Sequence, residues 1–178
     1  GKEITIDAGG FPVSKILLTG AGRTGECITP SKIVIHWSAG WSNNEGTRRA
    51  LESQGLSCQH GTDQDGSIEQ WVQLWEKKSE LTWCVGGNEN NYAVNNEIVG
   101  AWFIPPGSDP RVSENPSGAR VPSESSIQSS VNSTCFYMKQ YKIPSSQIFG
   151  HYELQPGKSD PGKAFLQYFI GRVKKTCG

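Results

Sequence analysis

Three histidines and one acidic turn are the residues of this chain whose chemistry could serve catalysis. The histidines are His36, His60 and His151, and His151 lies in the segment Gly150-His-Tyr-Glu-Leu-Gln-Pro-Gly-Lys-Ser-Asp-Pro-Gly162. A zinc hydrolase needs three nitrogen or oxygen ligands and a fourth position open to water, whose pKa the metal lowers to about 7. His36 and His151 could supply two nitrogens, and Asp160 could fold back across the Pro-Gly turn as the third ligand. These residues suggest a Zn²⁺ site, which spacing alone does not establish.

Each candidate residue also has a purely structural interpretation. An isolated histidine is more often a core residue with satisfied hydrogen bonds than a metal ligand, and this applies to His36 and His151. Asp160 precedes a proline and could cap a helix. Lys158 could be a solvated turn residue, and Glu97 could belong to a structural ion pair with an arginine. The site hypothesis therefore depends on the motifs around these residues.

The glycine pattern Gly20-Ala-Gly22-Arg-Thr-Gly25 matches the dinucleotide-binding fingerprint GxGxxG. That fingerprint opens a helix whose N-terminus holds pyrophosphate. Pro30 and the strand expected from Lys32 leave no room for such a helix, so we predict a glycine-rich turn. The chain also lacks the GxSxG, HExxH and GxxxxGK(S/T) signatures.

Length and charge limit the remaining choices. A chain of 178 residues, 35% of them hydrophobic, can bury one core but is short for two. We therefore expect an N-terminal arm at residues 1–30 and one domain at residues 31–178, acting as a monomer. Lys and Arg number 17 and Asp and Glu number 17, which gives no electrostatic reason to expect a nucleic acid or an anionic membrane as partner. No stretch approaches the roughly 18 apolar residues of a spanning helix.

Five cysteines are present, and none of them forms a CxxC pair. The count fits an oxidising compartment with up to two disulfides and one remaining thiol, or else buried free cysteines. We favour export, to the periplasm or out of the cell. A metal set of Cys58, His60 and Cys84 is a further alternative, although His60 is more simply a strand residue.

The elements that must position the candidate residues follow from local patterns. Lys32-Ile-Val-Ile-His-Trp37 is apolar on both alternating faces, as in a central strand, and places His36 at the carboxyl end. A helix is expected from Asn44, as cap, to Gln54, with Gly55 in the left-handed position after it. Leu56 to Thr62 and Ser67 to Leu74 flank an Asp-Gly turn and predict a hairpin.

The second half of the chain predicts one more strand and two helices. Residues 92–104 contain a strand in which Glu97 is a carboxylate in a buried-looking run. Residues 105–122 carry five prolines and predict a long loop of the kind that borders a site. Ile127, Val131, Cys135 and Met138 form a helical stripe over residues 123–141, and a helix after Pro161 presents Phe165, Phe169 and Val173. We expect a single α/β domain in which helices flank a mixed central sheet.

Four motifs occur in a common order and carry a family resemblance. They are Ile33-Val-Ile-His36 with Ser38-Ala-Gly40, Asp65-Gly-Ser-Ile-Glu-Gln-Trp-Val72, Asn96-Glu-Ile-Val-Gly100, and Gly150-His-Tyr-Glu with Pro156-Gly-Lys-Ser-Asp-Pro161. Together they resemble the type 2 N-acetylmuramoyl-L-alanine amidases, which share their fold with peptidoglycan recognition proteins and some phage endolysins. The resemblance runs from about residue 31 to the C-terminus.

The resemblance implies a function and a set of roles. The function is zinc-dependent hydrolysis of the amide bond between N-acetylmuramic acid and L-alanine in peptidoglycan or muropeptides. His36, His151 and Asp160 would bind zinc, and Lys158 would stabilise the oxyanion. Glu97 would act as the general base or as a carboxylate that orients the water.

Tryptophans and two departures from the family pattern bear on the substrate. Trp37 and Trp83 are expected to contact substrate, although aromatic residues in a small domain are more often core residues. Trp37 stands where family members often have a second histidine, and Trp83-Cys-Val-Gly86 stands for Trp-His-Ala-Gly. Two alternatives are a non-catalytic peptidoglycan-binding module of the same fold and a zinc amidase with a different substrate.

Overall fold

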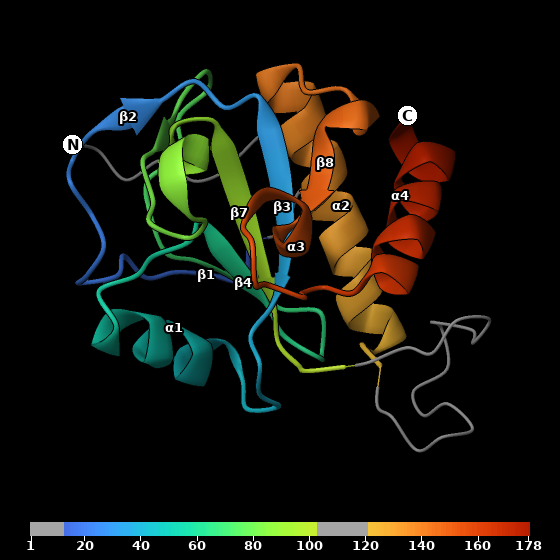
Figure 1. Ribbon diagram of the computed structural model, residues 1–178, viewed down its shortest axis with the longest axis horizontal. Helices are drawn as coiled ribbons and strands as arrows, with labels where there is room; N and C mark the ends of the chain where they lie inside the picture. Colours follow the sequence, from blue (N-terminus) through green and yellow to red (C-terminus); the bar gives the residue numbers. More distant parts are fainter. Residues whose placement is uncertain (1–12, 103–120) are drawn as a thin grey trace.

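A mixed sheet forms the centre of the fold in the computed structural model, which describes residues 13–102 and 121–178 (Figure 1). Within these residues, six strands run in the order β1-β5-β4-β7-β3-β8. The pair β4 and β5 is antiparallel, and the other neighbours are parallel. The strands are β1 (Lys15–Ile16), β3 (Lys32–Trp37), β4 (His60–Thr62), β5 (Ile68–Gln70), β7 (Ala93–Ile98) and β8 (Ile148–Gly150). The mixed α/β fold predicted from the sequence is confirmed.

Helices flank this sheet, and α2 and α4 pack side by side against one of its faces (Figure 1). The α-helices are α1 (Asn44–Ser53), α2 (Glu124–Tyr141), α3 (His151–Leu154) and α4 (Lys163–Cys177). Two short 3-10 turns, η1 (Gly87–Asn91) and η2 (Ser145–Gln147), and a small antiparallel pair, β2 (Cys27–Ile28) with β6 (Ser79–Glu80), complete the described elements. The predicted helices near residues 123–141 and after Pro161 are confirmed.

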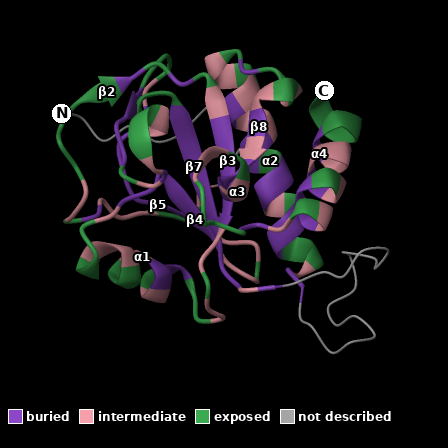
Figure 2. Ribbon diagram, viewed as in Figure 1, coloured by how far each residue is buried: buried purple, intermediate pink, exposed green. Residues whose placement is uncertain are grey.

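Side chains alternate across β3, and this alternation separates core residues from site residues. Ile33 and Ile35 lie in the main apolar core with residues of α2 and α4. Val34 lies in a smaller apolar cluster with Val85 and Ala93. His36 shares the parity of Val34, so its imidazole emerges away from α2 and α4. Figure 2 shows the central strands buried and exposed residues along α4.

The N-cap of the first helix lies one residue earlier in the chain than the sequence predicts. Asn43, not Asn44, is the N-cap, because its side chain accepts a hydrogen bond from the Gly46 amide at 2.7 Å. Asn44 is buried and instead contacts the hairpin, since its side chain donates to the Ser67 carbonyl at 3.2 Å. Gly55 has φ +71°, the left-handed value predicted after the helix.

The hairpin is confirmed with shorter strands, and the glycine-rich turn is confirmed. β4 and β5 pair antiparallel around the Asp-Gly turn, where Gly66 has φ +87°. Residues 20–26 contain bends and no helix, as expected for a turn. In the N-terminal arm, β1 pairs with the sheet edge at β5. The predicted loop at residues 105–122 lies outside the described residues except for its last two positions.

Two disulfides and one free thiol account for the five cysteines, as one of the two predicted arrangements requires. Cys58 bonds Cys84, Cys135 on α2 bonds Cys177 on α4, and Cys27 is free and exposed. The alternative metal set of Cys58, His60 and Cys84 is therefore wrong, because both sulfurs are engaged with each other and carry no thiolate charge.

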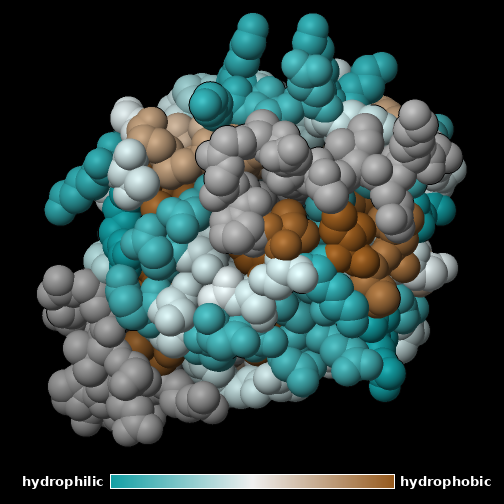
Figure 3. Space-filling model, turned by 180° about the vertical axis from the view of Figure 1, so that it is seen from behind, coloured by the Kyte–Doolittle hydropathy of each residue, from teal (hydrophilic) through white to brown (hydrophobic). Residues whose placement is uncertain are grey.

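Polar residues cover most of the molecule's rear face, where apolar residues surface only in small groups (Figure 3). Among the large apolar side chains of the described residues, Trp83 and Tyr92 are the exposed ones. No helix within residues 13–102 and 121–178 combines the length and apolar character that crossing a membrane requires.

The buried His60 is expected to make the stability of the fold sensitive to acid. Its side chain is fully buried, its Nδ1 lies 2.7 Å from the Tyr137 hydroxyl, and burial lowers its pKa to about 3. The unfolded chain binds the proton near its ordinary pKa of 6.5, so the free energy of unfolding falls as pH drops from there toward about 3. We expect a loss of about 1.4 kcal/mol per pH unit from this residue. Denaturant unfolding of the wild type and of His60→Gln at several pH values measures it, and equal pH slopes for the two proteins would contradict it.

Candidate metal centre

Two adjacent parallel strands bring His36 and His151 together. β3 and β8 pair with Ile35 opposite Gly150, and the next residue of each segment is a histidine. His36 is the penultimate residue of β3, and His151 begins α3 directly after β8. The two Nδ1 atoms lie 3.0 Å apart, and the rings meet edge to face with centroids 4.5 Å apart. The carboxyl end of the central strands therefore carries both imidazoles.

Asp160 completes the group from the turn between α3 and α4. Its Oδ2 lies 3.3 Å from the His36 Nδ1 and 3.2 Å from the His151 Nδ1. The turn is held in place because the Tyr152 amide donates to the Asp160 carbonyl at 3.1 Å, and the Trp102 indole donates to the Pro161 carbonyl at 2.8 Å. The structure thus brings together the three residues proposed as ligands from the sequence.

The outer nitrogen of each imidazole faces an amide oxygen. The His36 Nε2 lies 2.8 Å from the Asn95 Oδ1, and the His151 Nε2 lies 2.6 Å from the Gln155 Oε1. An amide oxygen accepts hydrogen bonds and cannot donate them, so each Nε2 carries the hydrogen and each Nδ1 presents a lone pair. Gln155 packs over Gly86, where a Cβ would come within 2.7 Å of the Gln155 side chain.

Three lone-pair donors converging in a buried space need a cation between them. All three residues are buried, with exposed fractions of 1% for His36 and 7% for His151 and Asp160. Zinc bonds of about 2.0–2.1 Å at tetrahedral angles separate ligand atoms by about 3.3 Å. The observed separations of 3.0, 3.3 and 3.2 Å fit that requirement. The donor set therefore suits a small divalent cation such as Zn²⁺.

The protonation states also suit a cation. Burial lowers the pKa of His36, which keeps the imidazole neutral at neutral pH. Burial alone would raise the pKa of Asp160, but its contacts with His151 and His36 outweigh burial and hold the pKa well below the usual range. An ionised carboxylate and a neutral imidazole are the forms that bind metal.

Glu97 lies on β7 directly opposite His36 in the strand register. It is buried, and its Oε1 is 3.8 Å from the His36 Nδ1. Burial raises the pKa of Glu97 well above its usual range, the Asp160 charge adds to the rise, and the Lys158 ammonium opposes it. A carboxylate with a high proton affinity beside the candidate ligands is suited to accept a proton.

The Cys58–Cys84 disulfide lies against Glu97. The Cys58 and Cys84 sulfurs are 3.6 and 3.9 Å from the Glu97 Oε1. His36, Cys84 and Glu97 also bring ligand-type atoms within reach of one ion. Because Cys84 is oxidised, this second grouping lacks its thiolate, and the set of His36, His151 and Asp160 is the stronger candidate.

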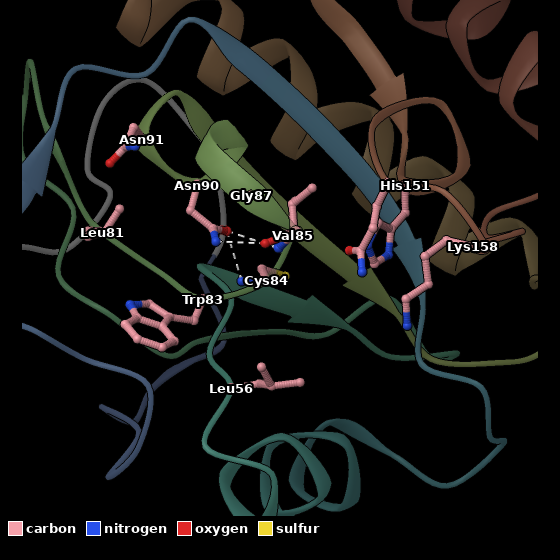
Figure 4. Close-up of a pocket in the computed structure, with 12 residues that line it drawn as sticks. Leu56, Leu81, Trp83, Cys84, Val85, Gly87, Asn90, Asn91, His151 and Lys158 are labelled. Atoms are coloured by element: carbon pink, nitrogen blue, oxygen red, sulfur yellow. Dashed lines mark hydrogen bonds between the residues drawn. The ribbon is translucent and has the colours of Figure 1, made fainter.

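A pocket of about 520 Å³ opens beside the candidate ligands (Figure 4). His151 and Lys158 line it from the C-terminal segment, and Trp83, half exposed, lines it from across the pocket. Asn90 holds the intervening wall by accepting hydrogen bonds from the Cys84 and Val85 amides at 3.0 and 2.9 Å. This pocket could receive an extended substrate whose scissile bond reaches the histidines.

The structure separates the two tryptophans predicted to contact substrate. Trp83 lines the pocket, whereas Trp37 is not among the pocket residues and packs edge to face on Trp102 with ring centroids 5.5 Å apart. Trp37 follows the parity of Ile33 and Ile35, so it packs against the main core.

Asn95 and Gln155 are contact residues that the sequence reasoning missed. A signal for Asn95 was present, because it is two residues before Glu97 and so lies on the same face of its strand. Gln155 follows His151 by one helical turn, which is the spacing of contacting side chains.

Comparison with known proteins identifies the family. The pattern of the N-acetylmuramoyl-L-alanine amidase family matches residues 27–163, and the chain belongs to this family. No curated protein sequence matches the chain.

Several solved structures share the fold. The catalytic domain of XlyA is 19% identical with a TM-score of 0.66, over 90% of this chain and 99% of that one. A mutant endolysin from Bacillus subtilis is 20% identical with a TM-score of 0.64, over 91% and 99% of the two chains. The E. coli amidase AmiD, in complex with the substrate anhydro-N-acetylmuramic acid-L-Ala-D-gamma-Glu-L-Lys, is 16% identical with a TM-score of 0.61, over 85% and 60%. At these identities the likeness establishes the fold.

Proposed function

We propose that this protein is a zinc-dependent amidase that cleaves the bond between N-acetylmuramic acid and L-alanine in peptidoglycan or its fragments. The observation that carries the proposal is the meeting of the His36 Nδ1, the His151 Nδ1 and the Asp160 Oδ2 within 3.0 to 3.3 Å of one another. Family membership supports the substrate class.

His36, His151 and Asp160 are the proposed zinc ligands. A zinc ion held by three protein ligands supplies Lewis-acid chemistry and acidifies water for attack on a carbonyl. The protein's part is to hold two neutral imidazoles and one carboxylate in place, with the pocket open on the side of His151.

Glu97 is the proposed general base. Water adds to the carbonyl carbon while Glu97 takes its proton, and the carbon–nitrogen bond then breaks as Glu97 returns that proton to the alanine nitrogen. The raised pKa of Glu97 favours the first transfer, in which the carboxylate accepts the proton. Lys158 lines the same pocket, and its ammonium can stabilise the negative charge that develops on the carbonyl oxygen.

The pocket wall around Trp83 is the proposed binding surface for the muropeptide. An exposed indole offers a flat apolar face that can stack on a sugar ring or an alkyl chain. We expect the domain to span residues 31–178 and to act as a monomer. The two disulfides favour a periplasmic or secreted location, since disulfides persist in oxidising compartments.

Metal removal and replacement test the proposal. The protein stripped with a chelator is expected to release no amino groups from purified peptidoglycan, and one equivalent of Zn²⁺ is expected to restore release of L-alanine amino termini. Binding to peptidoglycan without amino-group release by the zinc-loaded protein would identify a binding module instead. Hydrolysis of other amides without cleavage of muropeptides would identify a different zinc amidase.

A further inference from the structure

A buried chain of amides connects the protein backbone to His36 on the site face of the sheet. Gln59 precedes β4, and Asn95 lies in the middle of β7. Both side chains are 0% exposed. Buried amides with several hydrogen bonds have a fixed orientation, because rotating one would leave polar atoms unpaired.

The orientation of Gln59 is set by backbone groups. Its Nε2 donates to the backbone carbonyls of Glu80 and Ala93, each at 3.3 Å, and its Oε1 accepts from the backbone amide of Asn95 at 2.8 Å. Backbone carbonyls only accept and backbone amides only donate, so the two ends of the Gln59 amide cannot be exchanged.

Gln59 in turn orients Asn95. The Asn95 Nδ2 donates to the Gln59 Oε1 at 3.0 Å, and the Thr82 hydroxyl donates to the same oxygen at 3.2 Å. The Asn95 Oδ1 is therefore the atom that faces the His36 Nε2, at 2.8 Å. Because this oxygen can only accept, the His36 Nε2 must carry the hydrogen.

We propose that Asn95, held by Gln59, is a positioning residue that fixes His36 in its Nε2–H tautomer and aims the Nδ1 lone pair at the metal. The proposal rests on the proposed zinc site and goes beyond its ligands. An outer hydrogen bond of this kind raises the basicity of a ligating imidazole and fixes its plane. The buried site therefore binds metal with one imidazole already in the required tautomer and direction.

His151 is held differently. Its Nε2 partner is Gln155, a partly exposed side chain on the pocket wall, and the described residues show no chain of buried amides behind it. His36 is consequently the rigid ligand of the pair, and its positioning is expected to contribute more to metal affinity.

The first experiment measures Zn²⁺ affinity by competition with a chromophoric chelator. Asn95→Leu keeps the approximate side-chain volume and removes the acceptor, so affinity is expected to fall about 10- to 100-fold. Asn96→Leu is the matched control, because Asn96 is also buried on the same strand but points to the opposite face of the sheet. There its Oδ1 accepts a hydrogen bond from the Thr62 hydroxyl at 2.8 Å. Equal losses of affinity in the two variants would overturn the proposal.

A conservative variant separates positioning from stability. Asn95→Asp keeps an oxygen for the His36 Nε2–H but loses the donor to Gln59. Zinc affinity is expected to return close to the wild-type value while thermal stability stays reduced. An Asn95→Asp protein with the affinity of Asn95→Leu would contradict the assigned role.

The second experiment needs neither metal nor activity. Nitrogen-15 NMR of the metal-free wild type is expected to show a His36 Nε2 that carries its hydrogen. Gln59→Leu frees the Asn95 side-chain amide to rotate and is expected to give a mixture of His36 tautomers. A His36 Nε2 without a hydrogen in the metal-free wild type overturns the proposal. Failure of the wild type to bind zinc overturns the proposed function, and the tautomer measurement remains decisive for Asn95.

Discussion

Asp160→Ala is expected to abolish both zinc binding and amidase activity. Asp160 provides the negative charge of the candidate ligand set and contacts both imidazoles at 3.2 and 3.3 Å. Without it, two neutral histidines remain, which is fewer than the three ligands of catalytic zinc sites. Turnover should fall by more than about a thousandfold, because the attacking water loses its activation. Metal content per chain and amino-group release from peptidoglycan are the two measurements.

Thermal unfolding provides an independent measure of the same loss. Zinc that binds the folded state raises its stability by mass action, so the wild type should gain thermal stability on zinc addition and Asp160→Ala should not. Glu45→Ala is a suitable control, since Glu45 is an exposed carboxylate on α1 that pairs with Arg49 and is neither a candidate ligand nor a pocket residue. Full activity in a metal-free Asp160→Ala protein would contradict the mechanism.

The candidate ligands were accessible to sequence reasoning because each sits in a motif at an element boundary. His36 near the end of β3 and His151 directly after β8 are brought together by the parallel pairing of those strands, with Ile35 opposite Gly150. Strand alternation puts Glu97 on the same face as His36 once β3 and β7 are neighbours in register. The same rule places Trp37 on the face of the strand opposite to His36. The prediction that Trp37 contacts substrate did not take this alternation into account.

Other features depend on contacts that no local pattern contains. The pairing of Cys58 with Cys84 follows from tertiary proximity, and five cysteines allow many connectivities. Asn43 and Asn44 are equally good caps, and the choice was decided by the hairpin that engages Asn44. The role of Gln59 required knowing which backbone carbonyls lie around it.

The two-residue strands β1, β2 and β6 illustrate a limit of periodicity. A strand of two residues gives no alternation to detect, and its existence depends on a partner strand distant in sequence. Ile16 pairs opposite Gln70, and Ile28 pairs opposite Ser79. The long central elements were predictable because their burial patterns extend over several turns or alternations.

Glu97→Gln is expected to keep the metal and lose turnover. The amide has nearly the same shape as the carboxylate and lies beside the ligands rather than among them, since the Glu97 Oε1 is 3.8 Å from the His36 Nδ1. It cannot accept the proton of the attacking water, so kcat should fall by about 10²- to 10⁴-fold. The variant should also be at least as stable as the wild type in the metal-free form, because a neutral amide replaces a carboxyl whose ionisation burial opposes.

The comparison of Glu97→Gln with Asp160→Ala tests which carboxylate binds the metal and which transfers the proton. Metal analysis should give one zinc per chain for Glu97→Gln and none for Asp160→Ala, while both proteins lack turnover. Zinc loss in Glu97→Gln would make Glu97 a ligand, and turnover close to the wild-type rate would remove it from the proton transfer. Retained zinc with lost turnover would separate the carboxylate that moves the proton from the one that holds the ion.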